Sequence, residues 1–204
     1  VTALRGFLNN GRLRAEYRDV WQAQGRAAAH TWIKQYVRDN QTSFKAICDI
    51  TRHENTIIGN TVLYGATDGY LFAAGRAGER FAVRNSGAKV VVEGCGSNGC
   101  EYMTGGVAVI LGRIGANFGA GMTGGMAYLY DPDGMAEDFI NLESLGTCAV
   151  SHPHWEAQLK ELVERHAEET GSQKAHDILS NWEAERVNFL QVCPKEMLIH
   201  LSHQ

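Results

Sequence analysis

The sequence predicts a mainly β fold: a single-stranded right-handed parallel β-helix with 19-residue turns and flanking α-helices at both ends. Three observations favour it. Eighteen of the 23 glycines fall between Gly59 and Gly134. They are interleaved with Val, Ile, Leu and aromatic residues, not with the Ser, Pro and Gln typical of disorder. The glycines and the apolar runs recur at the same shift of 19 residues, and helix-like patterns occur only outside this segment.

The glycines superimpose when the chain is shifted by 19 residues. The matched sets are Gly59 with Gly78, Gly75 with Gly94, Gly96 with Gly115, Gly105 with Gly124, and Gly87 with Gly106 and Gly125. Glycine tolerates sharp bends and positive φ, so these residues are predicted to be structural corners of the coil. Their expected role is geometric.

The apolar runs repeat in the same way: residues 71–73 fall over 90–92, then over 109–111, then over 128–130. This divides the segment into four turns, 59–77, 78–96, 97–115 and 116–134. The unit is shorter than the common helical repeats, which need about 33 residues. Strands stacked roughly 4.8 Å apart fit it, and right-handed winding is the preferred hand. The β-helix is expected over residues 54–134.

Residues 1–53 are predicted to form a helical segment. An amphipathic stripe is traced by Tyr17, Val20, Trp21, Gln24, Ala28, Thr31, Trp32 and Tyr36. A solenoid needs its ends covered, so we expect this helix to cap the first turn. The segment carries nine Lys or Arg against four Asp or Glu. These charges are not clustered, which argues against a nucleic-acid partner.

Residues 135–204 are predicted to be a helical tail that packs on the open end or side of the coil. A turn at residues 131–134 ends the repeat. One helix carries Trp155 and stops at Gly171; a second is capped by Ser172 and runs through Trp182 to Val187. Both tryptophans are expected in the core.

Composition excludes several classes of protein. No apolar run approaches 18 residues, so no membrane span is expected, and the charged start of the chain does not read as a signal peptide. The five cysteines are odd in number and scattered. They are interpreted as reduced thiols of a cytoplasmic protein.

Two groups of residues resemble ligand sites. Residues 94–99 read G-x-G-x-x-G after a strand-like run, which is half of a dinucleotide-binding fingerprint. No helix is expected to follow, and no Asp or Glu lies about 20 residues on to bind a ribose. His152 and His154 could bind a metal, but a helix entry explains them better. Cys95 and Cys100 are too few for an iron–sulfur cluster and are expected to fill space in the coil.

Long motifs in this chain resemble a known family. They include Met103-Thr104-Gly105-Gly106, repeated as Met122-Thr123-Gly124-Gly125, within longer matches at 58–67, 74–87, 98–106 and 117–125. Together they look like the C-terminal β-helix (GXGXG) domain of the glutamate synthase large (alpha) chain. The resemblance runs from about Glu54 to near Pro194; residues 1–53 do not share it.

The resemblance implies a parent enzyme that moves the glutamine amide nitrogen to 2-oxoglutarate to make glutamate. In that family FMN and an iron–sulfur cluster lie in other domains, and a partner chain carries FAD and NADPH. The matched domain holds the other domains in place. For this chain the resemblance therefore implies no catalytic, cofactor-binding or metal-binding residue, and partners that are other domains or subunits of a glutamate synthase complex.

Two other functions remain open from the sequence. The chain could be a free-standing β-helix subunit of another oxidoreductase complex, similar to that of formylmethanofuran dehydrogenase. The less favoured alternative is a nucleotide-binding enzyme built on residues 94–99.

Overall fold

The computed structural model describes residues 11–25, 28–29, 31–32 and 55–198. The chain divides into two compact units, residues 1–50 and 51–204. In the first unit, helix α2 spans Gly11–Gln24 and ends where Gly25 takes a φ of 85°. The prediction of one unbroken helix from Tyr17 to Tyr36 is therefore wrong at Gly25, because a left-handed residue cannot continue a right-handed helix. Tyr36 and the chain that joins the two units lie outside the described residues. The predicted capping of the coil by this segment stays a prediction.

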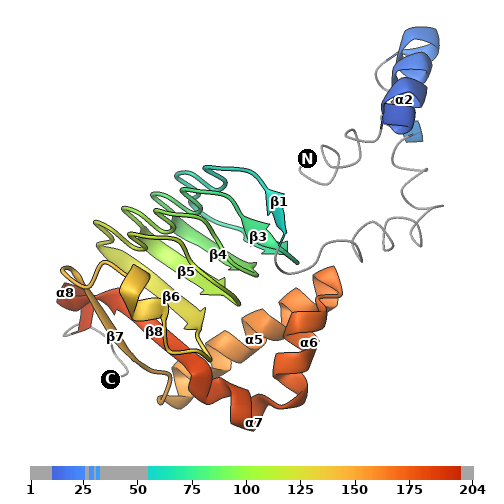
Figure 1. Ribbon diagram of the computed structural model, residues 1–204. Helices are drawn as coiled ribbons and strands as arrows, with labels where there is room; N and C mark the ends of the chain where they lie inside the picture. The colour runs from blue at the N-terminus through green and yellow to red at the C-terminus, as the bar shows by residue number, and fades with distance from the viewer. Residues whose placement is uncertain (1–10, 26–27, 30, 33–54, 199–204) are drawn as a thin grey trace. The chain divides into compact units, whose positions relative to one another are not determined.

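The second unit is built on a coil of short strands, and the predicted β-helix is confirmed. Parallel pairing joins β2, β4, β5 and β6 in consecutive order, and a second parallel pair joins β1 to β3. The rungs lie side by side in Figure 1. The right-handed winding stays a prediction. The strands of the coil are β1 Thr56–Ile58, β2 Tyr70–Ala73, β3 Arg76–Ala77, β4 Ser86–Val92, β5 Thr104–Ile110 and β6 Gly124–Tyr130.

The strands of the larger sheet are apolar on both faces because both faces are covered. Val90 and Val92 point into the coil, where they join one buried cluster, and Val91 between them joins a second cluster under the helices. The same alternation continues in β5 and β6. Sheets covered on both sides have nearly continuous apolar strands, and this explains the uninterrupted runs that carried the repeat in the sequence.

The stacking register differs from a uniform 19-residue shift. Val91 pairs with Val109, a separation of 18 residues, and the ladder shifts register between Ser86 and Lys89. The prediction that residues 90–92 lie over 109–111 is therefore wrong by one position. A one-residue slip reverses the face of every side chain in a strand, so a strict 19-residue register would set outward Val91 over inward Ile110. The irregularity at the start of the strand absorbs the difference.

The C-terminal part contains two strands that the sequence did not predict. β8 (Phe189–Pro194) pairs antiparallel with β6, and β7 (Leu145–Ala149) pairs antiparallel with β8. The prediction of a purely helical tail is therefore wrong. Leu145 and Val192 join the inner cluster and help to close the end of the coil. The remaining elements are η1 Ala136–Phe139, α5 Pro153–Thr170, α6 Gln173–Ser180, α7 Trp182–Glu185, η2 Arg186–Asn188 and α8 Lys195–Leu198.

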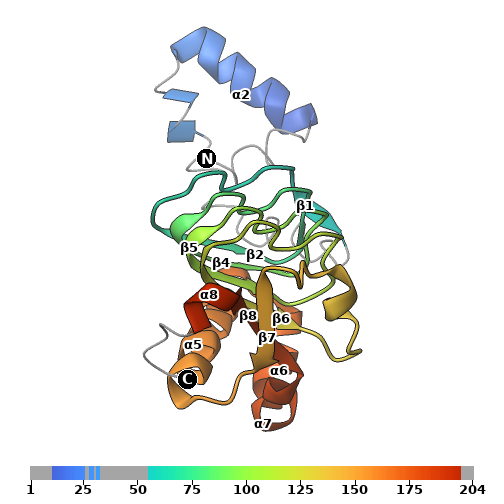
Figure 2. The ribbon, with the colours of Figure 1, turned by 90° about the vertical axis from the view of Figure 1, so that its left-hand side faces the viewer.

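Helices α5, α6 and α7 lie on one side of the coil, against the outer face of the larger sheet (Figure 2). Of the two predicted positions, the side is therefore the one observed. Gly171, with a φ of 66°, ends α5, and Ser172 caps α6, both as predicted. The second helix does not run on to Val187. It breaks at Asn181, and Val187 is 69% exposed.

The two tail tryptophans contact the same outer cluster. Trp182 is buried and Trp155 is half-buried. No helix within the described ranges is long and apolar enough to cross a bilayer.

Candidate functional site

The predicted corner glycines do not all lie in loops. Gly87, Gly105, Gly106, Gly124 and Gly125 are the early residues of strands β4, β5 and β6, next to the places where the register shifts. Gly59, Gly75, Gly78, Gly94, Gly96 and Gly115 lie between strands. The prediction of corners is thus wrong for the five strand glycines, which occupy irregular positions inside the ladder.

Close approach of the next rung explains several of these glycines better than backbone freedom. A Cβ at Gly105 would lie 2.3 Å from the carbonyl oxygen of Ser86, and one at Gly124 would lie 2.2 Å from that of Thr104. A side chain at either position would therefore push two rungs apart. Gly106, with a φ of 83°, and Gly125, with a φ of 85°, additionally need a backbone conformation that other residues rarely adopt.

The tight loop bends use other residues. Leu63, Ala82 and Cys100 have φ values of 64°, 56° and 57° and occupy equivalent places in successive turns, followed by Gly119 at 71°. Positive φ is costly for residues with a Cβ, so the stacked rungs must hold these bends in place. These positions could not be recognised from the sequence, because their side chains are of ordinary types.

The glycines of the nucleotide-like motif face the protein. A Cβ at Gly94 would lie 2.9 Å from the carbonyl oxygen of Arg113, and one at Gly96 would lie 2.8 Å from Glu79. At Gly99 it would meet the Cys95 sulfur at 2.8 Å. Residues 97–102 form a turn that leads into β5, with no helix at this point. The phosphate cradle and helix N-terminus of a dinucleotide site are therefore missing from residues 94–110.

Cys95 and Cys100 fill space inside the coil, as predicted. Burial raises the pKa of the Cys95 thiol to about 12 and that of Cys100 well above its ordinary value. Both are therefore protonated at neutral pH, whereas a metal ligand would have to be a thiolate. Among the described residues no group of three or more His, Cys, Asp or Glu side chains is arranged to hold a metal ion.

The two candidate histidines mark the start of α5. His152 is the N-cap residue, and its Nδ1 accepts a hydrogen bond of 3.1 Å from the backbone N–H of His154. Pro153 occupies the first turn. The interpretation as a helix entry is confirmed.

A buried polar cluster that the sequence did not reveal links the coil to the helices. Glu93 follows β4 and is 4% exposed. Its Oε1 accepts a hydrogen bond from the Ser172 hydroxyl, and the Nε2 of buried His166 lies 3.5 Å away. The same Ser172 oxygen accepts a 3.0 Å hydrogen bond from the Ala175 backbone as the cap of α6. The partners of Glu93 lie 73 and 79 residues away in the chain, so no local pattern could indicate them.

The ionisation of Glu93 favours this linking role. Burial raises the pKa of Glu93, but the hydrogen bonds from His166 and Ser172 and the charges of His166 and Lys174 outweigh burial. The pKa therefore lies below its ordinary value, and the group is a carboxylate at neutral pH. The Ser172 hydroxyl donates to this carboxylate while its oxygen accepts from the Ala175 backbone, so the group is held in place as a helix cap.

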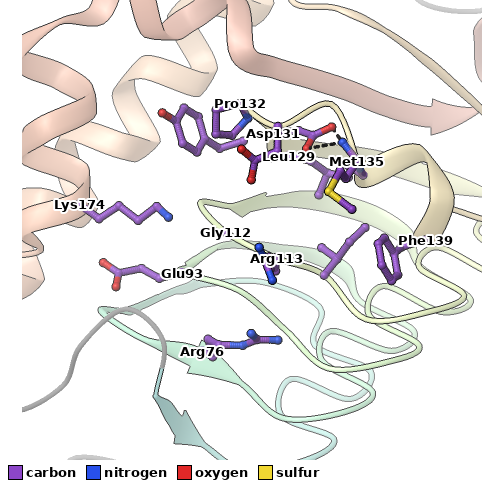
Figure 3. Close-up of a pocket in the computed structure, with 14 residues that line it drawn as sticks. Arg76, Glu93, Gly112, Arg113, Leu129, Asp131, Pro132, Met135, Phe139 and Lys174 are labelled. Atoms are coloured by element: carbon purple, nitrogen blue, oxygen red, sulfur yellow. Dashed lines mark hydrogen bonds between the residues drawn. The ribbon is translucent and has the colours of Figure 1, made fainter.

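Next to this cluster, a pocket of about 500 Å³ opens between the coil, the loop after β6 and the start of α6. In Figure 3, Lys174 and Glu93 lie at one end and Met135 and Phe139 at the other, with Arg113 between them. A Cβ at Gly112 would lie 2.4 Å from the carbonyl oxygen of Glu93, so this glycine lets two rungs approach closely at the pocket wall. The pocket is lined by both charged and apolar side chains, and this combination is suited to binding another molecule.

The comparisons with known proteins agree with this fold. A family model described as the GXGXG motif matches residues 35–195. The chain belongs to this family. The match begins earlier than Glu54, where the resemblance noted in the sequence began, and includes residues outside the described part of the structure.

Relatives of this GXGXG protein are glutamate synthases. The chain is 66% identical over 150 residues to the glutamate synthase [NADPH] large chain of Azospirillum brasilense, covering 74% of this chain and 10% of the relative. It is 57% identical over 142 residues to the ferredoxin-dependent glutamate synthase of Pyropia yezoensis, covering 70% and 9%. The corresponding values for the glutamate synthase [NADPH] large chain of Bacillus subtilis are 49% over 155 residues, 74% and 10%.

The resemblance to the β-helix domain of the glutamate synthase large chain is thereby confirmed. The chain spans about a tenth of the length of the curated relatives it matches. Those relatives accordingly contain other parts in the same polypeptide.

Proposed function

We propose that this chain is the scaffold domain of a glutamate synthase large chain and contributes no catalytic residue. The parent enzyme would transfer the glutamine amide nitrogen to 2-oxoglutarate to form glutamate. Membership of the GXGXG family and the identities with glutamate synthases of both the NADPH and the ferredoxin type support the parent. The domain's own part would be to hold neighbouring domains in fixed positions.

The observation that supports the scaffold role is that several of the glycines lie where neighbouring rungs of the coil leave no space for a side chain. At Gly105 and Gly124 a side chain would collide with the backbone of the neighbouring rung, and the motif at residues 94–99 faces protein atoms. The glycine-rich sequence is therefore accounted for by stacking. A rigid coil with helices on one side and a closed C-terminal end is a suitable spacer between larger domains.

The cofactors of such a parent would be bound elsewhere. FMN and an iron–sulfur cluster are expected in other domains, and FAD and NADPH on a partner chain. The described residues do not suit a cluster, because Cys95 and Cys100 are buried and protonated and no group of three ligands lies together. We derive no step of the reaction through this chain.

The test is purification of the native assembly that contains the chain, through an affinity tag on the chain. We expect the preparation to form glutamate from glutamine and 2-oxoglutarate with either NADPH or reduced ferredoxin as electron donor. An assembly that lacks this activity with both donors, and contains subunits of another oxidoreductase, would support the free-standing subunit instead. A micromolar dissociation constant for NADPH, ATP or FMN on the chain alone would contradict the absence of a nucleotide site.

A further inference from the structure

We propose that the pocket beside α6 is a docking socket for another segment of the parent polypeptide, outside these 204 residues. The segment would present a carboxylate side chain next to an apolar one. The inference rests on the proposed function, because it requires that the chain work inside a larger protein. It goes further by naming one surface of the scaffold and the chemistry of its partner.

The pocket holds cationic groups that form no close ion pair within the described residues 55–198. Arg76, Arg113 and Lys174 come from three separate parts of the fold and all line it. In residues 55–198 none of the three lies within 4.0 Å of a carboxylate, whereas Arg80 and Arg186 both form ion pairs. Arg76 donates one hydrogen bond, of 3.2 Å, to the carbonyl oxygen of Cys95. The guanidinium group of an arginine can donate two parallel hydrogen bonds to one carboxylate, so Arg113 is a suitable anchor for a carboxylate.

The carboxylates of the pocket are mostly committed to other contacts. Glu93 accepts the Ser172 hydroxyl. Asp131 accepts backbone hydrogen bonds from Met135 at 3.0 Å and Ala136 at 2.8 Å. Asp133 is exposed and is the remaining acidic side chain in the lining. The guanidinium groups of Arg76 and Arg113 are reached by none of these carboxylates within 4.0 Å, and an incoming carboxylate would supply acceptors for them.

The rim of the pocket is apolar and exposed. Met135 and Phe139 line the pocket and are 53% and 38% exposed. Large apolar side chains gathered beside charged groups are typical of a protein–protein contact. Since the match covers about a tenth of the relative's length, the rest of such a polypeptide is the natural source of the partner segment.

A zero-length carbodiimide reagent tests the contact, because it joins an amine directly to a carboxylate that touches it. The reagent is applied to the native assembly, and the joined peptides are identified by mass spectrometry. We expect Lys174 to be linked to an Asp or Glu outside this chain. Arg113→Glu should repel that carboxylate and reduce the yield of the link at least about tenfold. Arg84→Glu makes the same charge change on an exposed loop residue away from the pocket, and should leave the yield unchanged.

Three results would overturn the inference. The first is that Lys174 is linked only to Glu93 or Asp133, and the second is an equal yield of the external link in the Arg113 and Arg84 variants. The third is that a chemical reagent acetylates Lys174 as rapidly in the native assembly as in the denatured protein. Protection of Lys174 only on addition of a small dicarboxylate would also overturn it, by assigning the pocket to a free ligand. Glutamate formation is measured on the same preparation. Normal glutamate formation together with a Lys174 that is not protected from acetylation refutes the docking socket alone. A link from Lys174 to an external carboxylate without glutamate formation refutes the proposed parent enzyme alone.

Discussion

The sharpest prediction concerns Gly105, where the next rung leaves no space for a side chain. A Cβ there would lie 2.3 Å from the carbonyl oxygen of Ser86, and real Cβ atoms essentially never approach closer than 3.0 Å, so Gly105→Ala must open the stack by at least 0.7 Å. The nearest bonds between these rungs run from the Thr104 and Gly105 N–H groups to the Asn85 carbonyl, at 2.9 and 3.2 Å. Such an opening takes both beyond the range of a good hydrogen bond.

The magnitude follows from those two bonds and the strain. Two lost hydrogen bonds cost about 1 kcal/mol each, and overpacking adds about 1–3 kcal/mol. We therefore expect Gly105→Ala to reduce the free energy of unfolding by about 3–5 kcal/mol, which lowers Tm by roughly 6–20 °C for a protein of this size. Chemical and thermal unfolding followed by circular dichroism measure both quantities.

The matched control is Gly59→Ala. An added Cβ at Gly59 meets no atom within 4 Å, and the residue does not have positive φ. Its unfolding free energy should change by no more than about 0.5 kcal/mol. If Gly105→Ala melts within 2 °C of the Gly59 control, by the scale of roughly 2–4 °C per kcal/mol, the explanation by stacked backbones is refuted.

Other predictions concern the polar cluster and the thiols. Ser172→Ala removes both a helix cap and a charged hydrogen bond to Glu93, and should cost about 2–3 kcal/mol in urea unfolding; a loss below about 0.5 kcal/mol would contradict the cluster's linking role. The folded-state pKa of Glu93 lies below its unfolded value, so its contribution is present above the ordinary pKa of 4.5 and is lost as pH falls through the folded value. The stability gap between the parent protein and Glu93→Gln should therefore narrow below pH 4.5, and a gap that widens there would contradict this sign. In native protein a thiol reagent should modify exposed Cys148 well before buried Cys95 and Cys100, and equal rates for all three would show that the coil core is open.

The coil could be predicted from the sequence because its cause is local. Each turn repeats the same small residues and apolar runs, and every turn meets its neighbours in the same way. The shift of one residue between β4 and β5 escaped prediction because glycines recur at 19 while Val91 and Val109 pair at 18. Ladder irregularities change the count without leaving a distinctive residue type.

The parts that escaped prediction depend on contacts between distant segments. β8 is short and follows a helical pattern directly, and its strand state comes from pairing with β6. Glu93 looked like an ordinary charged residue at the end of an apolar run. Its burial depends on helices α5 and α6, which carry His166 and Ser172. In contrast, the caps at His152 and Ser172 were predictable because capping is set by residues next to one another in the chain.

The central claim is that successive turns stack directly, with outward residues over outward residues. Methyl–methyl nuclear Overhauser effects on the selectively labelled protein test it, since stacked methyl groups on strands about 4.8 Å apart give strong cross-peaks. The account predicts a cross-peak between Val91 and Val109 and another between Val90 and Ala108. A cross-peak from Val91 to Ile110 in their place, or no contact between these two rungs, would contradict it.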